Sequence, residues 1–279
     1  MRAARAFLHE RDLAALLPAP LRAIRIRLEK RIPVAAGLGG GSSDAAAVLR
    51  ALLALAVPEA AHDPEALAAV ALSVGADVPF FLDPAPAWVS GIGEVIAPIG
   101  DLPPLWLLLA NPGISVATAD VYGLWDHRFG RPAEPAPASG GSLTPEGAAS
   151  TMPALSGLGG DPKALIRLLT ALNGGAPGAG SRAPTIPNDL EAGAIRLCPP
   201  VARLRDRIGA LEDALALGMS GSGATVYGVF ASGSSAERAM AAACFESPVW
   251  ARVVRSLGVA PRVEVERGAG QDPGASPNW

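Results

Sequence analysis

Residues 31–56 read RIPVAAGLGGGSSDAAAVLRALLALA, and the dense glycine run inside this stretch decides how the chain is interpreted. Four glycines and two serines occupy the seven positions from Gly37 to Ser43, and a run rich in alanine and leucine follows directly. Glycine loses more conformational entropy on folding than any other residue, so such a density needs a reason. The alanine and leucine run predicts that the loop leads straight into an α-helix.

The residues around the glycine run suggest what it holds. Before it, residues 23–28 alternate apolar and arginine side chains, as a half-buried strand does. A strand, a glycine loop and a helix starting with Ser42 and Ser43 form a layout that binds phosphate, because unpaired amides at a helix start point outward and the helix dipole favours an anion. Serine caps in a tight turn would explain the serines but not the clustered glycines. A second Gly-Leu-Gly-Gly at 157–160 follows no expected strand and is interpreted as part of a linker.

Composition limits the class of protein. The chain has 279 residues, of which 50% are hydrophobic and 18% charged, as expected for a globular protein. A net charge of −3 makes nucleic acid or an anionic membrane surface an unexpected partner. The two cysteines, Cys198 and Cys244, are too few for a disulfide framework or a zinc site, so we expect a reducing cytoplasm. We expect no membrane span, since charges interrupt every long apolar run.

Periodicity, capping residues and turn residues predict the other elements. Asp63 and Pro64 form a well-marked helix start, and Gly91 and Gly93 mark a hairpin turn. Residues 128–187 are rich in Pro, Gly, Ala and Ser and are interpreted as a low-complexity insertion. The expected helices are 4–17, 42–57, one starting at 63, 161–173, one following Pro200 and 233–245; the expected strands are 23–28, 88–99 as a hairpin, 105–110, 224–230 and 262–266.

The glycine loop does not fit the two commonest phosphate-binding motifs. A P-loop ends in Gly-Lys followed by Ser or Thr, whereas this loop ends in Ser42, Ser43 and Asp44. A dinucleotide fingerprint would place a third glycine where Ser42 stands and an acidic residue at the end of a following strand. A different kind of phosphate loop is therefore required.

Five strings, in this order, resemble the motifs of the GHMP-type small-molecule kinases. They are PVAAGLGGGSSDAA (33–46), GADVPFF (75–81), NPGISVATADVY (111–122), NDLE (188–191) and MSGSGATVYGVF (219–230). The resemblance covers roughly residues 1–128 and 186–266. It implies an α+β, two-domain fold with an incomplete N-terminal domain. Residues 1–110 would form the truncated nucleotide-binding domain, 111–266 the C-terminal domain with the insertion at about 128–187, and 267–279 a flexible tail.

The resemblance also implies a reaction. The triple glycine and GADVPFF resemble the corresponding motifs of one family member in particular. That member uses ATP and Mg²⁺ to phosphorylate a hydroxyl of a cytidine-diphosphate-linked methylerythritol, a step in the non-mevalonate route to isoprenoids. A homoserine or mevalonate acceptor is the enzyme alternative, and these two strings argue against it. The other alternative is a catalytically inactive nucleotide-binding fragment.

The resemblance assigns the site residues. Asp77 would be the general base that accepts the hydroxyl proton, the alternative being a turn aspartate before Val78 and Pro79. The nucleotide phosphates would lie against a continuous run: Pro33, Val34, Ala35, Ala36, Gly37, Leu38, Gly39, Gly40, Gly41, Ser42 and Ser43.

Other matched positions have ordinary structural explanations. The loop at 220–223 would lie beside the nucleotide loop in the family, although a plain turn into a strand explains it nearly as well. Asn188 and Glu191 have the spacing of a helix capping box, which we prefer. Asp44 is expected in the first turn of a helix, with Mg²⁺ as the alternative. Lys30 and Arg31 precede the loop and are expected to be solvated strand-end charges, with phosphate contact as the alternative.

Two strings of the family are not found in these 279 residues. Family members begin with a strand carrying a PAKxNL-like motif, which holds the active lysine, and continue to a DGYH-like segment that helps to bind the cytidine substrate. We therefore expect the first strands to be missing. Either the recorded start is too late within a longer kinase, or the chain is a fragment that binds nucleotide without catalysis.

Overall fold

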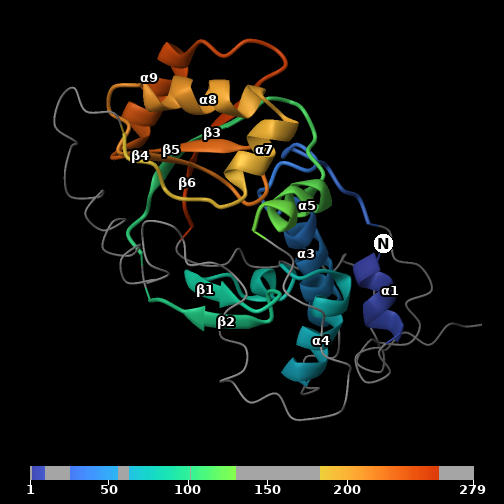
Figure 1. Ribbon diagram of the computed structural model, residues 1–279. Coiled ribbons are helices and arrows are strands. Elements are labelled where there is room, and N and C mark those ends of the chain that lie inside the picture. Colours follow the sequence, from blue (N-terminus) through green and yellow to red (C-terminus); the bar gives the residue numbers. More distant parts are fainter. Residues whose placement is uncertain (1, 10–25, 56–62, 101, 130–182, 258–279) are drawn as a thin grey trace, which may run out of the picture.

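The computed structural model describes residues 2–9, 26–55, 63–100, 102–129 and 183–257. They form a helical part with a small hairpin, and a second part built on a four-stranded sheet (Figure 1). Both sheets are antiparallel, and helices both precede and separate their strands along the chain. The α+β class is confirmed.

The helical part is held together by one apolar cluster. Helices α1 (Arg2–His9), α3 (Gly40–Leu55) and α4 (Pro64–Val74) all contact one another. Phe7 and Leu49 are fully buried between them, together with Leu52. Full burial stabilises each such side chain by about 1.5–3 kcal/mol relative to exposure, so this cluster fixes the direction of α3 and the position of its first turn.

The chain around α4 forms as the sequence predicts. The Asp63 side chain caps the helix by accepting from the Glu65 amide at 2.8 Å, and Pro64 is the first helical residue. A short 3₁₀ helix, η1 (Phe80–Leu82), follows. The predicted hairpin is also present, as β1 (Ala87–Ser90) paired with β2 (Val95–Pro98). Its tip glycine, Gly93, is buried against Ala76.

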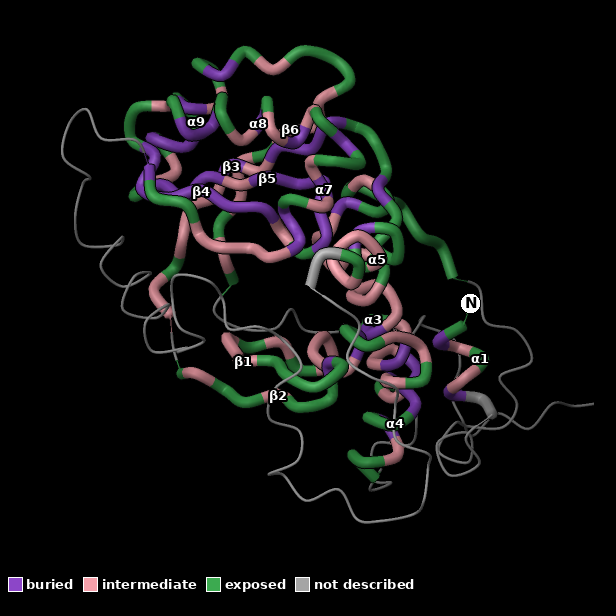
Figure 2. Tube along the Cα trace, in the orientation of Figure 1, coloured by how far each residue is buried: buried purple, intermediate pink, exposed green. Residues whose placement is uncertain are grey.

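The sheet of the second part has the strand order β4-β5-β3-β6. Its strands are β3 (Trp106–Asn111), β4 (Ala216–Met219), β5 (Val226–Phe230) and β6 (Trp250–Arg255). Helix α8 (Pro200–Gly209) contacts the β4 and β5 half, and α9 (Gly233–Ala243) the β3 and β6 half, so both cover one face (Figure 1). The buried residues of this part concentrate along the sheet and its covering helices (Figure 2).

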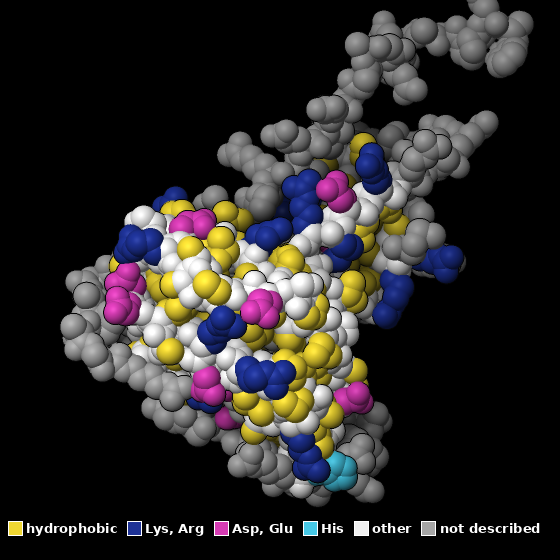
Figure 3. All heavy atoms as spheres, turned by 90° about the horizontal axis from the view of Figure 1, so that it is seen from above, with side chains coloured by type: hydrophobic (Ala, Val, Ile, Leu, Met, Phe, Trp, Pro, Cys, Tyr) yellow, Lys and Arg dark blue, Asp and Glu magenta, His cyan; other side chains and the backbone are white. Residues whose placement is uncertain are grey.

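Helices α5 (Thr118–Phe129) and α7 (Glu191–Leu197) contact each other and complete the second part. On the face seen in Figure 3, acidic and basic side chains are interspersed among apolar ones. Within the described ranges, no helix combines the length and the apolar character that crossing a membrane requires.

Several sequence predictions differ from the structure. Residues 26–28 of the expected strand are exposed and irregular, because no described strand lies alongside to pair with them. Helix α3 begins at Gly40, two residues earlier than expected. Elements α5, β4 and β6 were not predicted at all. The expected helix at 161–173, the strand at 262–266 and nearly all of the low-complexity insertion lie outside the described residues.

Candidate active site

The glycine loop meets α3 in a geometry that leaves amides facing outward. Gly40 and Gly41 form the first turn, and the Ser43 amide donates to the Gly39 carbonyl at 2.8 Å. The amides before Ser43 therefore have no acceptor within the helix. The Ser43 hydroxyl donates to the Gly40 carbonyl at 3.1 Å, so it does not cap the helix as a serine cap would. A side chain at Gly41 would meet no atom within 4 Å, so the space beside this turn is open.

Three residues before the helix have a left-handed backbone conformation. Ala35, Gly37 and Gly39 have φ values of 53°, 71° and 63°, whereas the residues between them do not have positive φ. Within the predicted run from Pro33 to Ser43, Val34 is exposed and Ala36 is buried.

Segments from the second part hold this loop. The Ser220 hydroxyl donates to the Gly37 carbonyl at 2.8 Å, and the Thr225 amide donates to the Ala36 carbonyl at 3.3 Å. A β-carbon at residue 37 would lie 2.6 Å from the Gly223 carbonyl oxygen, so only glycine fits. Residues 220–223 therefore lie beside the glycine loop, as the resemblance implies, and they also form a turn that leads into β5.

Lys30 and Asp44 form an ion pair at the start of α3. The Lys30 Nζ atom lies 2.6 Å from Asp44 Oδ2, with both side chains about one-third exposed. The same Nζ atom is 3.6 Å from where a β-carbon of Gly40 would stand. Lys30 is exposed, as expected of a solvated charge, but it also pairs with Asp44. The expected placement of Asp44 in the first turn is wrong, because the helix starts earlier. Arg31 is exposed and pairs with Glu29 at 3.1 Å.

Asp77 lies on an exposed turn, and two apolar neighbours pack this turn against the helical part and the glycine loop. Val78 is 2% exposed and belongs to the helical core. The ring of Phe81 lies over Gly39, where a β-carbon would come within 2.7 Å of its Cζ atom. The segment that carries Asp77 therefore packs directly on the glycine loop.

Tyr122 on α5 is a residue of this site that the sequence did not single out. Burial raises the pKa of its phenol, and the nearby negative charge of Asp77 raises it further. The start of α5 is bound to the turn at residues 219–223, since the hydroxyls of Thr118 and Ser222 are 2.9 Å apart. Tyr122 lies within the matched string 111–122, which was the available signal.

The capping-box interpretation of Asn188 and Glu191 is wrong. The Asn188 side chain donates to the carbonyls of Met219 and Gly221, in the turn at residues 219–223, and no side chain caps α7. Glu191 is buried and forms a 2.8 Å ion pair with Arg205. Burial raises the pKa of the Glu191 carboxyl, and Arg205 partly offsets this increase.

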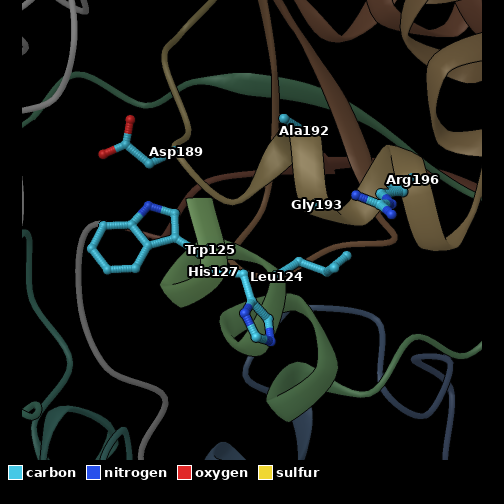
Figure 4. A pocket seen from close by; sticks show the side chains of 7 residues that line it. All are labelled: Leu124, Trp125, His127, Asp189, Ala192, Gly193 and Arg196. Carbon is cyan, nitrogen blue, oxygen red and sulfur yellow. The ribbon is translucent and has the colours of Figure 1, made fainter. Parts of the chain in front are cut away.

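A separate pocket of about 240 Å³ lies between α5 and α7 (Figure 4). Its lining has an aromatic ring, an acidic and a basic side chain, and no residue of the glycine loop. The lining residues are Leu124, Trp125, His127, Asp189, Ala192, Gly193 and Arg196.

Comparison with known proteins places these features in a family. The model of the GHMP kinases N terminal domain matches residues 1–83, and the GHMP kinases C terminal model matches residues 152–248. A 4-diphosphocytidyl-2-C-methyl-D-erythritol kinase of Cereibacter sphaeroides is 38% identical over 230 residues, covering 81% of this chain and 68% of that protein. A kinase of the same name from Anaeromyxobacter dehalogenans is 42% identical over 214 residues, covering 75% of this chain and 55% of that protein. The chain thus spans between about half and 70% of the length of such relatives.

Solved structures agree. A crystal structure of 4-(cytidine 5'-diphospho)-2C-methyl-D-erythritol kinase matches with a TM-score of 0.57 and 33% identity, covering 90% of this chain and 77% of that one. A homoserine kinase from Cytophaga hutchinsonii matches with a TM-score of 0.52 at 16% identity, which shows the common fold alone. From these matches and the glycine loop together, the chain belongs to the GHMP kinase family.

Proposed function

We propose that this chain transfers the γ-phosphoryl group of ATP to a hydroxyl of 4-diphosphocytidyl-2-C-methyl-D-erythritol. The observation that carries the proposal is the packing of Phe81 on Gly39, because it holds the Asp77 turn and the glycine loop together. The names of the relatives at 38–42% identity support this acceptor. The proposed site comprises the cradle at Pro33 to Ser43 and the base Asp77.

The cradle is suited to the nucleotide phosphates. Amides at the start of α3 present partial positive charge, and Lys30 adds a full positive charge at the same end. Such preorganised donors stabilise the charge on the phosphoryl group in the transition state of transfer, without having to reorganise. The open space beside Gly41 leaves room for the phosphates.

Asp77 supplies the proton acceptor. As the acceptor hydroxyl oxygen bonds to the γ-phosphorus, its proton passes to the Asp77 carboxylate. The bond from that phosphorus to the bridging oxygen of the β-phosphate breaks, and ADP leaves with the electron pair. Asp77 is exposed on its turn, so an acceptor can reach the carboxylate from solvent, and Tyr122 stands close by on α5.

Mg²⁺ accompanies ATP in this proposal. In kinase sites it is held by one or two carboxylates together with substrate phosphates and water. Asp44, in the second turn of α3, would join the phosphates in holding it. When bound, Mg²⁺ neutralises charge on the phosphate oxygens.

The test measures ADP release by the full chain with ATP and Mg²⁺. The acceptors are 4-diphosphocytidyl-2-C-methyl-D-erythritol, homoserine and mevalonate, each at the same concentration. We expect release with the first acceptor only. Release with another acceptor would contradict the proposed substrate. If the chain binds added ADP but forms no ADP from ATP with any of the three acceptors, it is a nucleotide-binding fragment without catalytic activity.

A further inference from the structure

We propose that Asn188 is a positioning residue for the glycine loop. Its side-chain amide fixes the backbone turn at 219–223, and this turn fixes Gly37. The inference rests on the proposed function, since it treats the glycine loop as the place where nucleotide phosphates bind. It assigns a role to a side chain that lies on the segment before α7, outside the loop itself.

The Asn188 side chain is fully committed to backbone groups. Its Nδ2 atom donates to the Met219 carbonyl and to the Gly221 carbonyl, each at 2.8 Å. Its Oδ1 atom accepts from the Leu190 amide at 2.9 Å. Both amide hydrogens are used, and because carbonyl oxygens only accept, the nitrogen must face the turn.

The turn passes this constraint to the glycine loop. Inside the turn, the Gly223 amide donates to the Ser220 carbonyl at 3.0 Å, and the Ser220 amide donates to the Thr225 carbonyl at 2.9 Å. The Ser220 hydroxyl then holds the Gly37 carbonyl at 2.8 Å. Gly37 has no free space on this side, since its α-carbon faces the carbonyls of Ser220 and Gly223. A shift of the turn must therefore shift Gly37.

The side chain of Asn188 is separable from the fold around it. The first turn of α7 uses the Asn188 backbone, whose carbonyl accepts from the Glu191 amide at 3.0 Å, and any substitution keeps this bond. In Asn188→Asp the side chain keeps its shape and its acceptor for Leu190. It loses both donors and places a negative charge beside two carbonyl oxygens. The substitution thus acts on the turn and not on the helix.

The test is ADP binding by calorimetry, together with KM for ATP and kcat. For Asn188→Asp and for the uncharged variant Asn188→Ser, we expect the Kd for ADP and the KM for ATP to rise about tenfold, the effect of losing one or two hydrogen bonds. We expect kcat at saturating ATP to change less than about threefold, on the same basis. Ile208→Val, at a fully buried residue of α8, is the control: it lowers stability but leaves the Kd for ADP unchanged.

A double variant tests the route of the effect. Because Asn188 acts through Ser220, Ser220→Ala and Asn188→Asp together should weaken ADP binding by less than the product of their separate effects. A multiplicative result, or a folded Asn188 variant with unchanged Kd and KM, would overturn the positioning role. The unmodified chain is measured separately. Failure of that chain to bind ADP would reject the proposed function, and the positioning role with it.

Discussion

The ring of Phe81 occupies the space where a side chain at Gly39 would stand, so the turn that carries the proposed base rests on the loop that holds the proposed phosphates. Neither residue needs to touch a substrate for this contact to matter. It fixes the separation between the proton acceptor and the phosphate cradle, and small displacements of such groups are costly in catalysis.

Gly39→Ala should therefore destabilise the fold. The new methyl group would meet the Phe81 ring at 2.7 Å, and φ at this position is 63°. We expect the free energy of unfolding to fall by about 2 kcal/mol, as for overpacking combined with backbone strain. Urea denaturation measures this change. Gly41→Ala is the matched control, because nothing lies within 4 Å of its β-carbon. A decrease of equal size in both variants would contradict the proposed packing.

Asp77→Asn should lower the pKa of Tyr122. Burial and then the Asp77 charge raise this pKa, and the second cause disappears with the carboxylate. The chain has two tyrosines, so in a Tyr227→Phe background the phenolate absorbance reports Tyr122 alone. We expect the titration of Tyr122 to move to lower pH in Asp77→Asn and to stay in place in Asp83→Asn. An unmoved titration would mean that Asp77 and Tyr122 do not face each other.

Tyr227 should make stability decline at high pH. Burial and the nearby Glu191 charge raise its pKa to about 12, whereas a tyrosine in the unfolded chain ionises near 10. Between these values the unfolded state gives up a proton that the native state keeps. The stabilisation that the protonated Tyr227 phenol contributes is therefore intact below pH 10. It is lost by pH 12, where the free energy of unfolding is lower by about 3 kcal/mol. The difference between the original chain and Tyr227→Phe isolates it, and parallel stability curves would be the contrary result.

Lys30→Met should weaken ADP binding more than it weakens the fold. The ammonium group lies at the start of α3, while its ion pair with Asp44 is partly exposed and worth at most about 1 kcal/mol. We expect a roughly five- to tenfold rise in Kd at low salt, shrinking as salt screens the charge. Arg31→Gln removes the same charge from the next residue, which pairs with exposed Glu29. Equal effects of the two substitutions would show that only net charge matters.

Local signals in the sequence predicted local structure well. Asp63 and Pro64 marked the start of α4, and the glycines at 91 and 93 marked the hairpin. Strand β6 was missed because arginines at 252 and 255 interrupt the alternation expected of a strand. The strand predicted at 23–28 had the right alternation, but a strand also needs a partner, which alternation does not supply.

The site was predictable where one continuous string forms it, and not where distant segments meet. The glycine loop and the Asp77 turn are each continuous. Lys30 and Asp44 are 14 positions apart, and their pairing depends on where α3 begins. Asn188 reaches Met219 across 31 positions, and its local spacing to Glu191 suggested a capping box instead. Local patterns carry no information about which distant backbone a side chain will contact.

The most direct test of the central claim follows the labelled γ-phosphoryl group of ATP onto 4-diphosphocytidyl-2-C-methyl-D-erythritol. The full chain, Asp77→Asn and Asp83→Asn are compared under identical conditions. If Asp77 is the base, label reaches the acceptor with the full chain and with Asp83→Asn, and transfer falls by about 10²–10⁴-fold in Asp77→Asn while ADP binding is retained. Equal transfer by Asp77→Asn and the full chain would contradict the account.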